Sequence, residues 1–337
     1  MGPAVPKTLQ PTWAATTFSF TTELVTGEHS PNEIVESLGG VPAIEAVELD
    51  GFQHFRSFPD VDEAEADEFR RLVSETGLKL IELGVYNDLV ESSGRVRDLD
   101  WQATFLETQI RSAARLGFTR TKVMFGLDPE LQRRLERVLD ETGIRLLQEV
   151  QGKLTPSSPA LDEQRSFAAA RPDHFGFVFD LSATMHGVPV TFLDFLGRRG
   201  VPREAIRLIS EDWAGDHTDT TKDAVVAILD RTDIDPLTRR QAMTPFTRFG
   251  NSRVKDFREF LTSVEHIHLK YWDLEDAGGI VSEPICDLRR ELDLVAYDGA
   301  VTSEWGGHEW IEDATGLEMT EKHLDLARSV WLAGAEK

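Results

Sequence analysis

The chain has 337 residues, 40% of them hydrophobic and 28% charged, which is enough for one large barrel or two ordinary domains. Its formal net charge of −23 argues against nucleic-acid binding, because such a surface repels a phosphate backbone. The single cysteine, Cys286, cannot form an internal disulfide, and neither a membrane-spanning apolar run nor a secretory apolar core is evident. We therefore expect a cytoplasmic protein without membrane contact.

Short β-rich runs alternate with helical runs through the first half of the chain. The predicted strands are residues 12–21, 44–52, 78–86, 119–126, 143–152 and 174–182. Between them the apolar spacing predicts helices near residues 31–39, 63–77, 100–117, 128–142 and 160–171. Strands that alternate with helices in this way indicate right-handed βαβ units and a parallel sheet.

The alternation is interrupted at residues 190–263, which we predict to be mostly helical, and it resumes with strands at 266–273 and 299–307. Eight strands give an α/β fold, a single (β/α)8 TIM barrel over residues 1–337, with residues 183–263 as a long helical insertion between strands six and seven. We expect this insertion to lie beside the barrel mouth and to contact substrate or a second subunit. A doubly wound open sheet is the alternative, but no glycine-rich phosphate motif follows the first strand.

Four successive predicted strands carry acidic or imidazole side chains near their carboxyl ends. These residues are Glu149, Asp180, His268 and Glu304. Active-site groups of TIM barrels lie at this end, and adjacent strands are only about 4.8 Å apart, so the four side chains can converge. Three carboxylates and one imidazole suit a divalent ion, most simply Mn²⁺, with Mg²⁺, Zn²⁺ or Co²⁺ as alternatives.

The stretch "EHIHLKYWD" (265–273) places His266, His268, Lys270 and Trp272 on one face of a strand. We interpret His268 as the metal ligand and His266 as a deeper residue that orients it or bonds to it. Lys270 would then lie nearer the mouth, where its ammonium group can stabilise a developing oxyanion.

The motifs "LLQEVQG", "FVFDLS", "HIHLKYWD" and "GAVTSEWGG" resemble those of the xylose-isomerase-like barrels, which include sugar and sugar-phosphate isomerases and epimerases. The resemblance implies one metal held by the four residues above and catalysis on a keto sugar or polyol through an enediolate. Glu149 and Glu304 would flank the carbon that loses its proton. The glutamate with a free oxygen near that carbon would be the base, and we favour Glu149.

A narrower resemblance concerns "SEWGGHEW" (303–310), which looks like the eighth-strand region of the catalytic subunits of bacterial C-glycoside deglycosidases. Those proteins pair with a small β-rich subunit and cleave the carbon–carbon bond between a 3-keto sugar and an aromatic aglycone. They place a histidine near the fifth-strand glutamate, where this chain has Gln148 and Gln151. Another base would then be needed, and the histidines considered for it are His54, His186 and His308.

Three functions stay open at this level: a metal-dependent sugar isomerase or epimerase, a C-glycoside deglycosidase catalytic subunit, and a non-catalytic partner or sugar-binding barrel. Each would take a small carbohydrate or glycoside, with a small β-rich subunit or a second copy of the chain as partner. The residues expected to contact this ligand are His54, Tyr86, Trp305 and His308.

Overall fold

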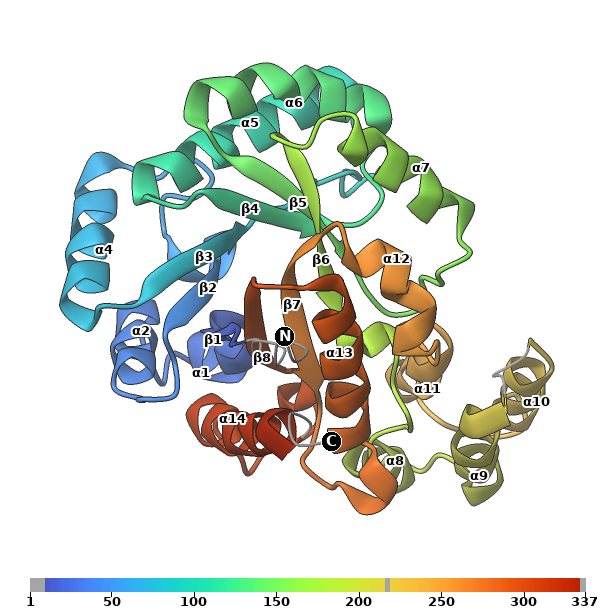
Figure 1. Cartoon of the computed structure of the whole chain (residues 1–337). Helices are drawn as coiled ribbons and strands as arrows, with labels where there is room; N and C mark the ends of the chain where they lie inside the picture. Colours follow the sequence, from blue (N-terminus) through green and yellow to red (C-terminus); the bar gives the residue numbers. More distant parts are fainter. Residues whose placement is uncertain (1–9, 216–218, 334–337) are drawn as a thin grey trace, which may run out of the picture.

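In the computed structural model, which describes residues 10–215 and 219–333, eight parallel strands close into a barrel in chain order (Figure 1). They are β1 (Thr12–Thr16), β2 (Ala46–Asp50), β3 (Lys79–Gly84), β4 (Arg120–Met124), β5 (Arg145–Val150), β6 (Phe175–Asp180), β7 (Val264–Tyr271) and β8 (Ala300–Trp305). The barrel is closed by β1 and β8, where Trp13 lies opposite Val301. The predicted TIM barrel is confirmed.

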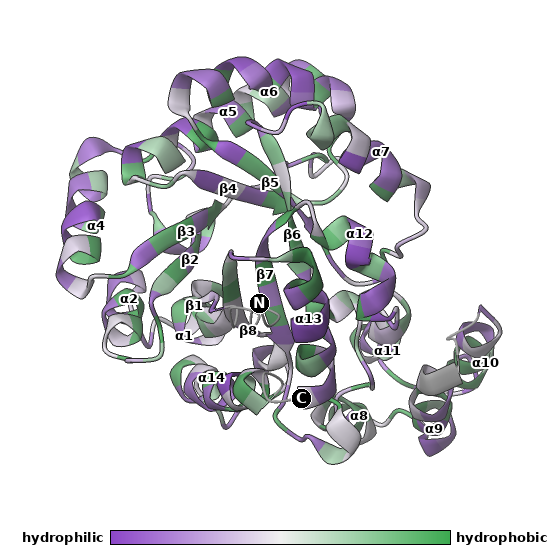
Figure 2. Cartoon of the chain, in the orientation of Figure 1, coloured by the Kyte–Doolittle hydropathy of each residue, from purple (hydrophilic) through white to green (hydrophobic). Residues whose placement is uncertain are grey.

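Helices surround the barrel, and their termini follow local sequence signals. The helices outside the β6–β7 connection are α1 (Thr21–Thr26), α2 (Pro31–Gly39), α3 (Gly51–His54), α4 (Glu63–Thr76), α5 (Leu99–Leu116), α6 (Pro129–Thr142), α7 (Pro159–Ala169), α13 (Ser282–Val295) and α14 (Gly316–Ala333). Ser30 and Glu33 form a capping box at the start of α2, and Gly77 ends α4 in the left-handed conformation, φ 71°. Figure 2 shows hydrophobic and hydrophilic residues mixed along α4, α5 and α6, as expected for helices with one buried face. Within the described ranges, no helix has the length and apolar character needed to cross a membrane.

The strands bury apolar side chains on their outer face and polar ones inside the barrel. Val47, Leu49, Ile267 and Leu269 are fully buried in the layer between strands and helices. The residues between them in sequence, Glu48 and His268, point inward and meet across the barrel. Strand alternation therefore places ionisable groups in the barrel interior, where only other polar groups can satisfy them.

The first strand is shorter than the predicted 12–21. Thr16 accepts a hydrogen bond from the backbone N–H of Phe18, which starts a 3-10 turn over Thr17–Phe20 directly before α1. The prediction was wrong here because a β-branched, aromatic-rich run has high strand propensity even where the chain turns. The turn brings Phe18 to the barrel mouth.

Residues 181–263 connect β6 to β7 and are mostly helical, as predicted. They contain α8 (Val190–Arg198), α9 (Arg203–Glu211), α10 (Asp219–Leu229), α11 (Pro236–Ala242) and α12 (Arg258–Leu261). Phe192, Ile209 and Val225 form a separate small core with Trp272 and Trp310, which follow β7 and β8. Helices α8 to α11 consequently pack at the carboxyl end of the strands, on the mouth side, whereas α12 directly precedes β7 and packs in the main core. That the segment is an insertion relative to other barrels stays a prediction.

Candidate active site

The four side chains that the sequence singled out lie together at the carboxyl end of the barrel. The Nδ1 atom of His268 is 2.7 Å from Glu304 Oε2, 3.0 Å from Glu149 Oε1 and 3.6 Å from Asp180 Oδ2. All four residues are at most 4% exposed. One ligand atom from each lies within 4.8 Å of the others, so a single ion has room to contact all four.

The polar atoms of this cluster fit a bound cation. The Nδ1–H group of His268 can donate to only one carboxylate, yet three carboxylates surround it. Glu304 Oε2 and Asp180 Oδ2 have no hydrogen-bond partner of acceptable geometry. Burial, together with the nearby charge of Glu304, raises the pKa of Asp180. A divalent ion would remove both problems, since three carboxylate oxygens and one imidazole nitrogen suit Mn²⁺ and similar metals.

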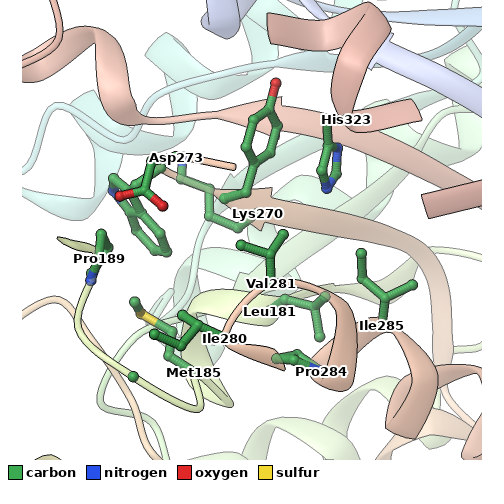
Figure 3. Close-up of a pocket in the computed structure, with 13 residues that line it drawn as sticks. Leu181, Met185, Pro189, Lys270, Asp273, Ile280, Val281, Pro284, Ile285 and His323 are labelled. Carbon is green, nitrogen blue, oxygen red and sulfur yellow. The ribbon is translucent and has the colours of Figure 1, made fainter. Parts of the chain in front are cut away.

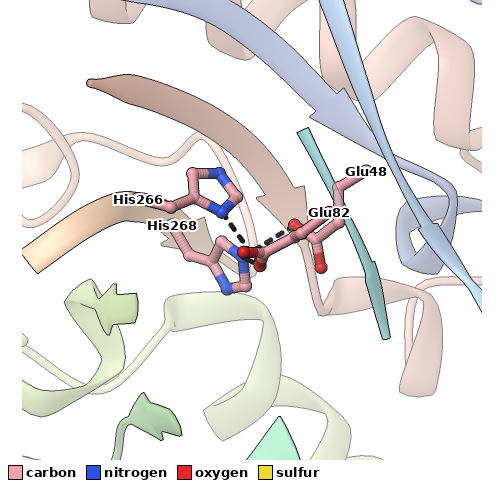
Figure 4. Close-up of side chains that lie close together, drawn as sticks. All are labelled: Glu48, Glu82, His266 and His268. Carbon is pink, nitrogen blue, oxygen red and sulfur yellow. Dashed lines mark hydrogen bonds and ion pairs between the residues drawn. The ribbon is translucent and has the colours of Figure 1, made fainter. Parts of the chain in front are cut away.

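The other side of His268 faces a second buried cluster (Figure 4). His268 Nε2 is 2.7 Å from Glu48 Oε2, and His266 Nδ1 is 2.9 Å from Glu82 Oε1. His266 also lies 2.5 Å from the hydroxyl of Thr302. His266 was expected to orient His268 or to hydrogen-bond to it. The hydrogen bond is wrong, because His266 directs its nitrogens to Thr302 and Glu82; the two rings touch edge to face with centroids 4.9 Å apart, and an orienting role stays a prediction.

This second cluster also offers four ligand atoms within 4.8 Å. We favour the first cluster for the ion because Glu149 and Glu304 line the cavity at the mouth, whereas Glu82 and His266 of the second cluster are fully buried and do not line it. Both oxygens of Glu48 are used, by His268 and by Lys122 at 2.9 Å. Burial would raise the pKa of Glu48, but the charges of His268 and Lys122 lower it to about 2. Glu48 thus orients His268 so that Nδ1 faces the three other carboxylates, as a carboxylate behind a metal-binding histidine does.

Two lysines that line the cavity contact Glu149 and Glu304. Lys122 Nζ is 3.1 Å from Glu149 Oε2, and Lys270 Nζ is 3.0 Å from Glu304 Oε1. Burial would raise the pKa values of Glu149 and Glu304, but His268 and these lysines hold both below their usual range. Glu149 lacks the free oxygen assumed in the sequence-based mechanism, since one oxygen is hydrogen-bonded to His268 and the other pairs with Lys122. Glu304 binds Lys270 through Oε1, while its Oε2 lies near His268 without a hydrogen bond of acceptable geometry.

A cavity of about 580 Å³ opens above the cluster. It is lined by Thr16, Phe18, Glu48, Leu49, Asp50, Gly84, Val85, Tyr86, Lys122, Met124, Phe125, Glu149, Gln151, Gly152, Lys153, Leu154, Thr247, Arg248, Lys270 and Glu304. Tyr86 is 42% exposed and donates its hydroxyl to Asp50, so its ring stands at the cavity edge where a ligand can reach it. Thr247 and Arg248 belong to the β6–β7 connection, which therefore forms part of the wall; its contact with substrate or a second subunit stays a prediction.

An apolar pocket lies near the end of β7, beside Leu181, Met185, Ile280 and Pro284 (Figure 3). Its volume of about 30 Å³ is sufficient for a water molecule and far too small for a sugar. The cavity above the cluster is the candidate substrate site, because Glu149 and Glu304 line it.

Trp305, His54 and His308 do not line that cavity. Trp305 is 1% exposed and donates its indole N–H to the carbonyl of Trp272, so it has no face open to a ligand and stacking is not supported. His54 packs against Phe69, outside the mouth, and burial lowers its pKa to about 3. His308 contacts Trp305 edge to face, and burial and Lys270 lower its pKa to about 4.

Gln148, Gln151 and His186 were considered in the search for a general base beside Glu149. Gln148 points away from the cavity, where it accepts the N–H groups of Gly126 and Leu127, whereas Gln151 lines the cavity. His186 is 3.2 Å from Glu283 of α13 and is not among the cavity residues. None of these positions supplies a histidine beside Glu149.

Sequence reasoning missed Glu48, Glu82 and Lys122. A usable signal existed, because each is a charged residue inside a short β-rich run, in "AVELD", "KLIELG" and "RTKVM". A charge in a strand that is covered on both sides must be paired inside the protein. The residues with which these three charges pair could not be predicted from the sequence, because contacts across a barrel depend on how the barrel closes.

No family model matches the chain. A C-glycoside deglycosidase alpha subunit of Microbacterium trichothecenolyticum is 26% identical over 311 residues, covering 89% of this chain and 84% of that protein. A 3'-dehydrocarminate deglycosidase alpha subunit of a Microbacterium species is 25% identical over 333 residues, covering 95% of both chains.

Solved structures share the fold. A sugar phosphate isomerase/epimerase from Parabacteroides distasonis has a TM-score of 0.54 at 13% identity, covering 97% of this chain and 99% of that one. D-psicose 3-epimerase from Clostridium cellulolyticum H10 has a TM-score of 0.53 at 13% identity, covering 95% and 99%. Both resemblances read from the motifs are confirmed. The curated relatives are deglycosidase alpha subunits, which confirms the prediction of an enzyme.

Proposed function

We propose that this chain is the catalytic subunit of a metal-dependent carbon–carbon lyase that cleaves 3-keto C-glycosides. The observation that carries the proposal is the convergence of Glu149, Asp180, His268 and Glu304 below one cavity. The substrate class is taken from relatives named C-glycoside deglycosidase alpha subunits, which align with most of the chain.

Glu149, Asp180 and Glu304 would hold the ion, Mn²⁺ in our proposal, together with Nδ1 of His268. Such an ion, when bound, supplies Lewis-acid polarisation of a ketone and stabilises the charge that develops when the neighbouring C–H proton leaves. Glu48 keeps Nε2 of His268 occupied and its ring in place, 2.7 Å away.

Proton abstraction falls to a glutamate at the cavity floor, and we propose Glu149. Lys122 lies 3.1 Å from Glu149 Oε2 and keeps this carboxylate ionised and directed toward the cavity. On the other side, Lys270 holds Glu304 and adds positive charge near the substrate oxygens. The base must exchange its lysine contact for the substrate proton, which makes Lys122 a positioning residue for the step.

A sugar isomerase or epimerase is the second candidate. It is favoured by Gln148 and Gln151, the neighbours of Glu149 where the deglycosidases would offer a histidine. Gln148 turns its side chain away from the cavity, and Gln151 lines it. This activity requires the same metal centre and proton abstraction, with the proton returned to the sugar and no bond to an aglycone broken. A sugar-binding barrel without catalysis is the third.

One assay separates the three candidates. The manganese-loaded protein is incubated in D₂O with a 3-keto C-glucoside of a phenolic aglycone, followed by chromatography for released aglycone and NMR for deuterium at the sugar carbon next to the ketone. A lyase releases aglycone, an epimerase introduces deuterium without release, and a binding protein does neither. Protein treated with chelator is the matched control and should be inactive in both readouts.

The relatives' name, alpha subunit, leads us to propose a partner of the small β-rich type, with a homo-oligomer as the alternative. The native mass of tagged protein purified from its own cells, with the identity of any co-purified chain, distinguishes the two. The turnover assay is therefore run on the native assembly as well as on the isolated chain.

A further inference from the structure

The cavity wall carries four cationic side chains, and three of them have a carboxylate partner. Lys122 and Lys270 are bound to the glutamates of the cavity floor, and Arg248 makes two hydrogen bonds, of 2.6 and 2.7 Å, to Glu309. The exception is Lys153: among the residues that the structure describes, no carboxylate lies within 4.0 Å of its ammonium group.

The surroundings of Lys153 make this exception notable in a chain with a net charge of −23. Its ammonium group lies 5.7 Å from the ring centre of Trp213, a weak cation–π contact. Burial lowers the pKa of Lys153, and no acidic side chain offsets that effect. A half-buried ammonium group without a counter-charge would gain from an anion that enters the cavity.

The backbone segment that carries Arg248 packs tightly against the loop that carries Lys153. A Cβ atom built on Gly152 would lie only 2.7 Å from the carbonyl oxygen of Arg248, and one on Gly250 would lie 2.1 Å from the oxygen of Gly152. The N–H of Gly250 also donates to the carbonyl of Ser182 at 2.7 Å. The segment carrying Arg248 is therefore fixed against the loop carrying Lys153, and both side chains line the cavity.

We infer that Lys153 and Arg248 form an anion subsite on the cavity wall, and that the ligand taken there carries a single carboxylate. Arg248 contacts Glu309 through its two terminal nitrogens, which leaves Nε–H and further N–H groups to donate to a carboxylate. One unpaired ammonium group matches one negative charge, whereas a multiply charged ion would be repelled by the acidic chain. If the ligand is the glycoside of the proposed function, its carboxylate is on the aglycone, which lies at the rim above the metal centre. This part of the inference rests on the proposed function.

The subsite is tested with small probes on the metal-loaded protein. Benzoate, its neutral isostere benzamide and inorganic phosphate are titrated by calorimetry. We expect benzoate to bind at least about tenfold more tightly than benzamide, and Lys153→Met to abolish that preference with metal content unchanged. Lys79→Met removes the same charge at the opposite end of the barrel, where Lys79 pairs with Glu45 at 3.7 Å, and should retain the preference.

Arg248 needs its own comparison, because Arg248→Met also breaks the contact with Glu309. If Arg248 binds the anion, Glu309→Gln frees the guanidinium group and keeps or strengthens benzoate binding, while Arg248→Met weakens it. If Arg248 only clamps the rim, both variants weaken binding equally and its part in the subsite is refuted.

Equal binding of benzoate and benzamide, or a preference unaffected by Lys153→Met, overturns the inference. Phosphate binding more tightly than benzoate overturns the assignment to a carboxylate. Failure of the proposed function is a separate result, since the benzoate preference can hold while no aglycone is released and no deuterium enters the sugar.

Discussion

Replacing Glu48 with glutamine tests how the metal-binding histidine is oriented. Glu48 is 2% exposed, accepts from His268 Nε2 at 2.7 Å and lies 2.9 Å from Lys122. Glutamine keeps the size of the side chain and removes its charge, so His268 loses its anionic acceptor. Loss of such a carboxylate typically weakens metal binding by about 10–100-fold, which corresponds to about 1.4–2.7 kcal/mol.

The assay is titration of Mn²⁺ into chelator-treated protein, followed by calorimetry or by the EPR signal of free Mn²⁺. Glu45→Gln is the matched control, because Glu45 directly precedes β2 and pairs only loosely with Lys79, at 3.7 Å. At saturating Mn²⁺, Glu48→Gln should regain most of its turnover, which a misfolded protein would not. Wild-type metal affinity in Glu48→Gln would refute the orienting role.

Three further predictions follow from the same contacts. Asp180→Ala should abolish stoichiometric metal binding, measured by mass spectrometry of the metal, while circular dichroism stays unchanged; retained metal would exclude Asp180 as a ligand. Glu149→Gln should lower turnover by about 10²–10⁴-fold and metal affinity far less, and equal losses in both would contradict a base role. The buried, neutral His54 has a pKa of about 3 in the folded protein and about 6.5 in the unfolded chain. Between these pH values only the unfolded chain binds the proton, so the free energy of unfolding falls as pH drops through this window. Between pH 7 and pH 5 the wild type should lose about 2 kcal/mol more than His54→Phe in urea unfolding, and parallel losses would refute the assignment.

Much of the candidate site could be predicted from the sequence, because the position of a residue along its strand determines where it lies in the barrel. Glu149, Asp180 and Glu304 fall near the carboxyl ends of predicted strands and His268 lies within another, and closure of a parallel barrel brings these positions together. This required only the correct number of strands and correct boundaries to within a few residues.

Other features depended on contacts that strand patterns do not encode. Glu48 reaches His268 from the opposite side of the barrel, so its role appears only once the barrel is closed. The prediction that Trp305 contacts the ligand was wrong, although the alternation of side chains along a strand could have excluded it. If Glu304 points into the barrel, Trp305 must point outward to α14, where it packs with Met319. The short helix α3 carries His54 away from the mouth, which no periodicity predicts over four residues.

Anomalous diffraction at the manganese absorption edge, from crystals of protein never exposed to chelator, tests the central claim most directly. We predict one peak bounded by Nδ1 of His268 and the carboxylates of Glu149, Asp180 and Glu304. The absence of any peak after soaking with Mn²⁺, or a peak between Glu82 and His266 on the far side of His268, would contradict it.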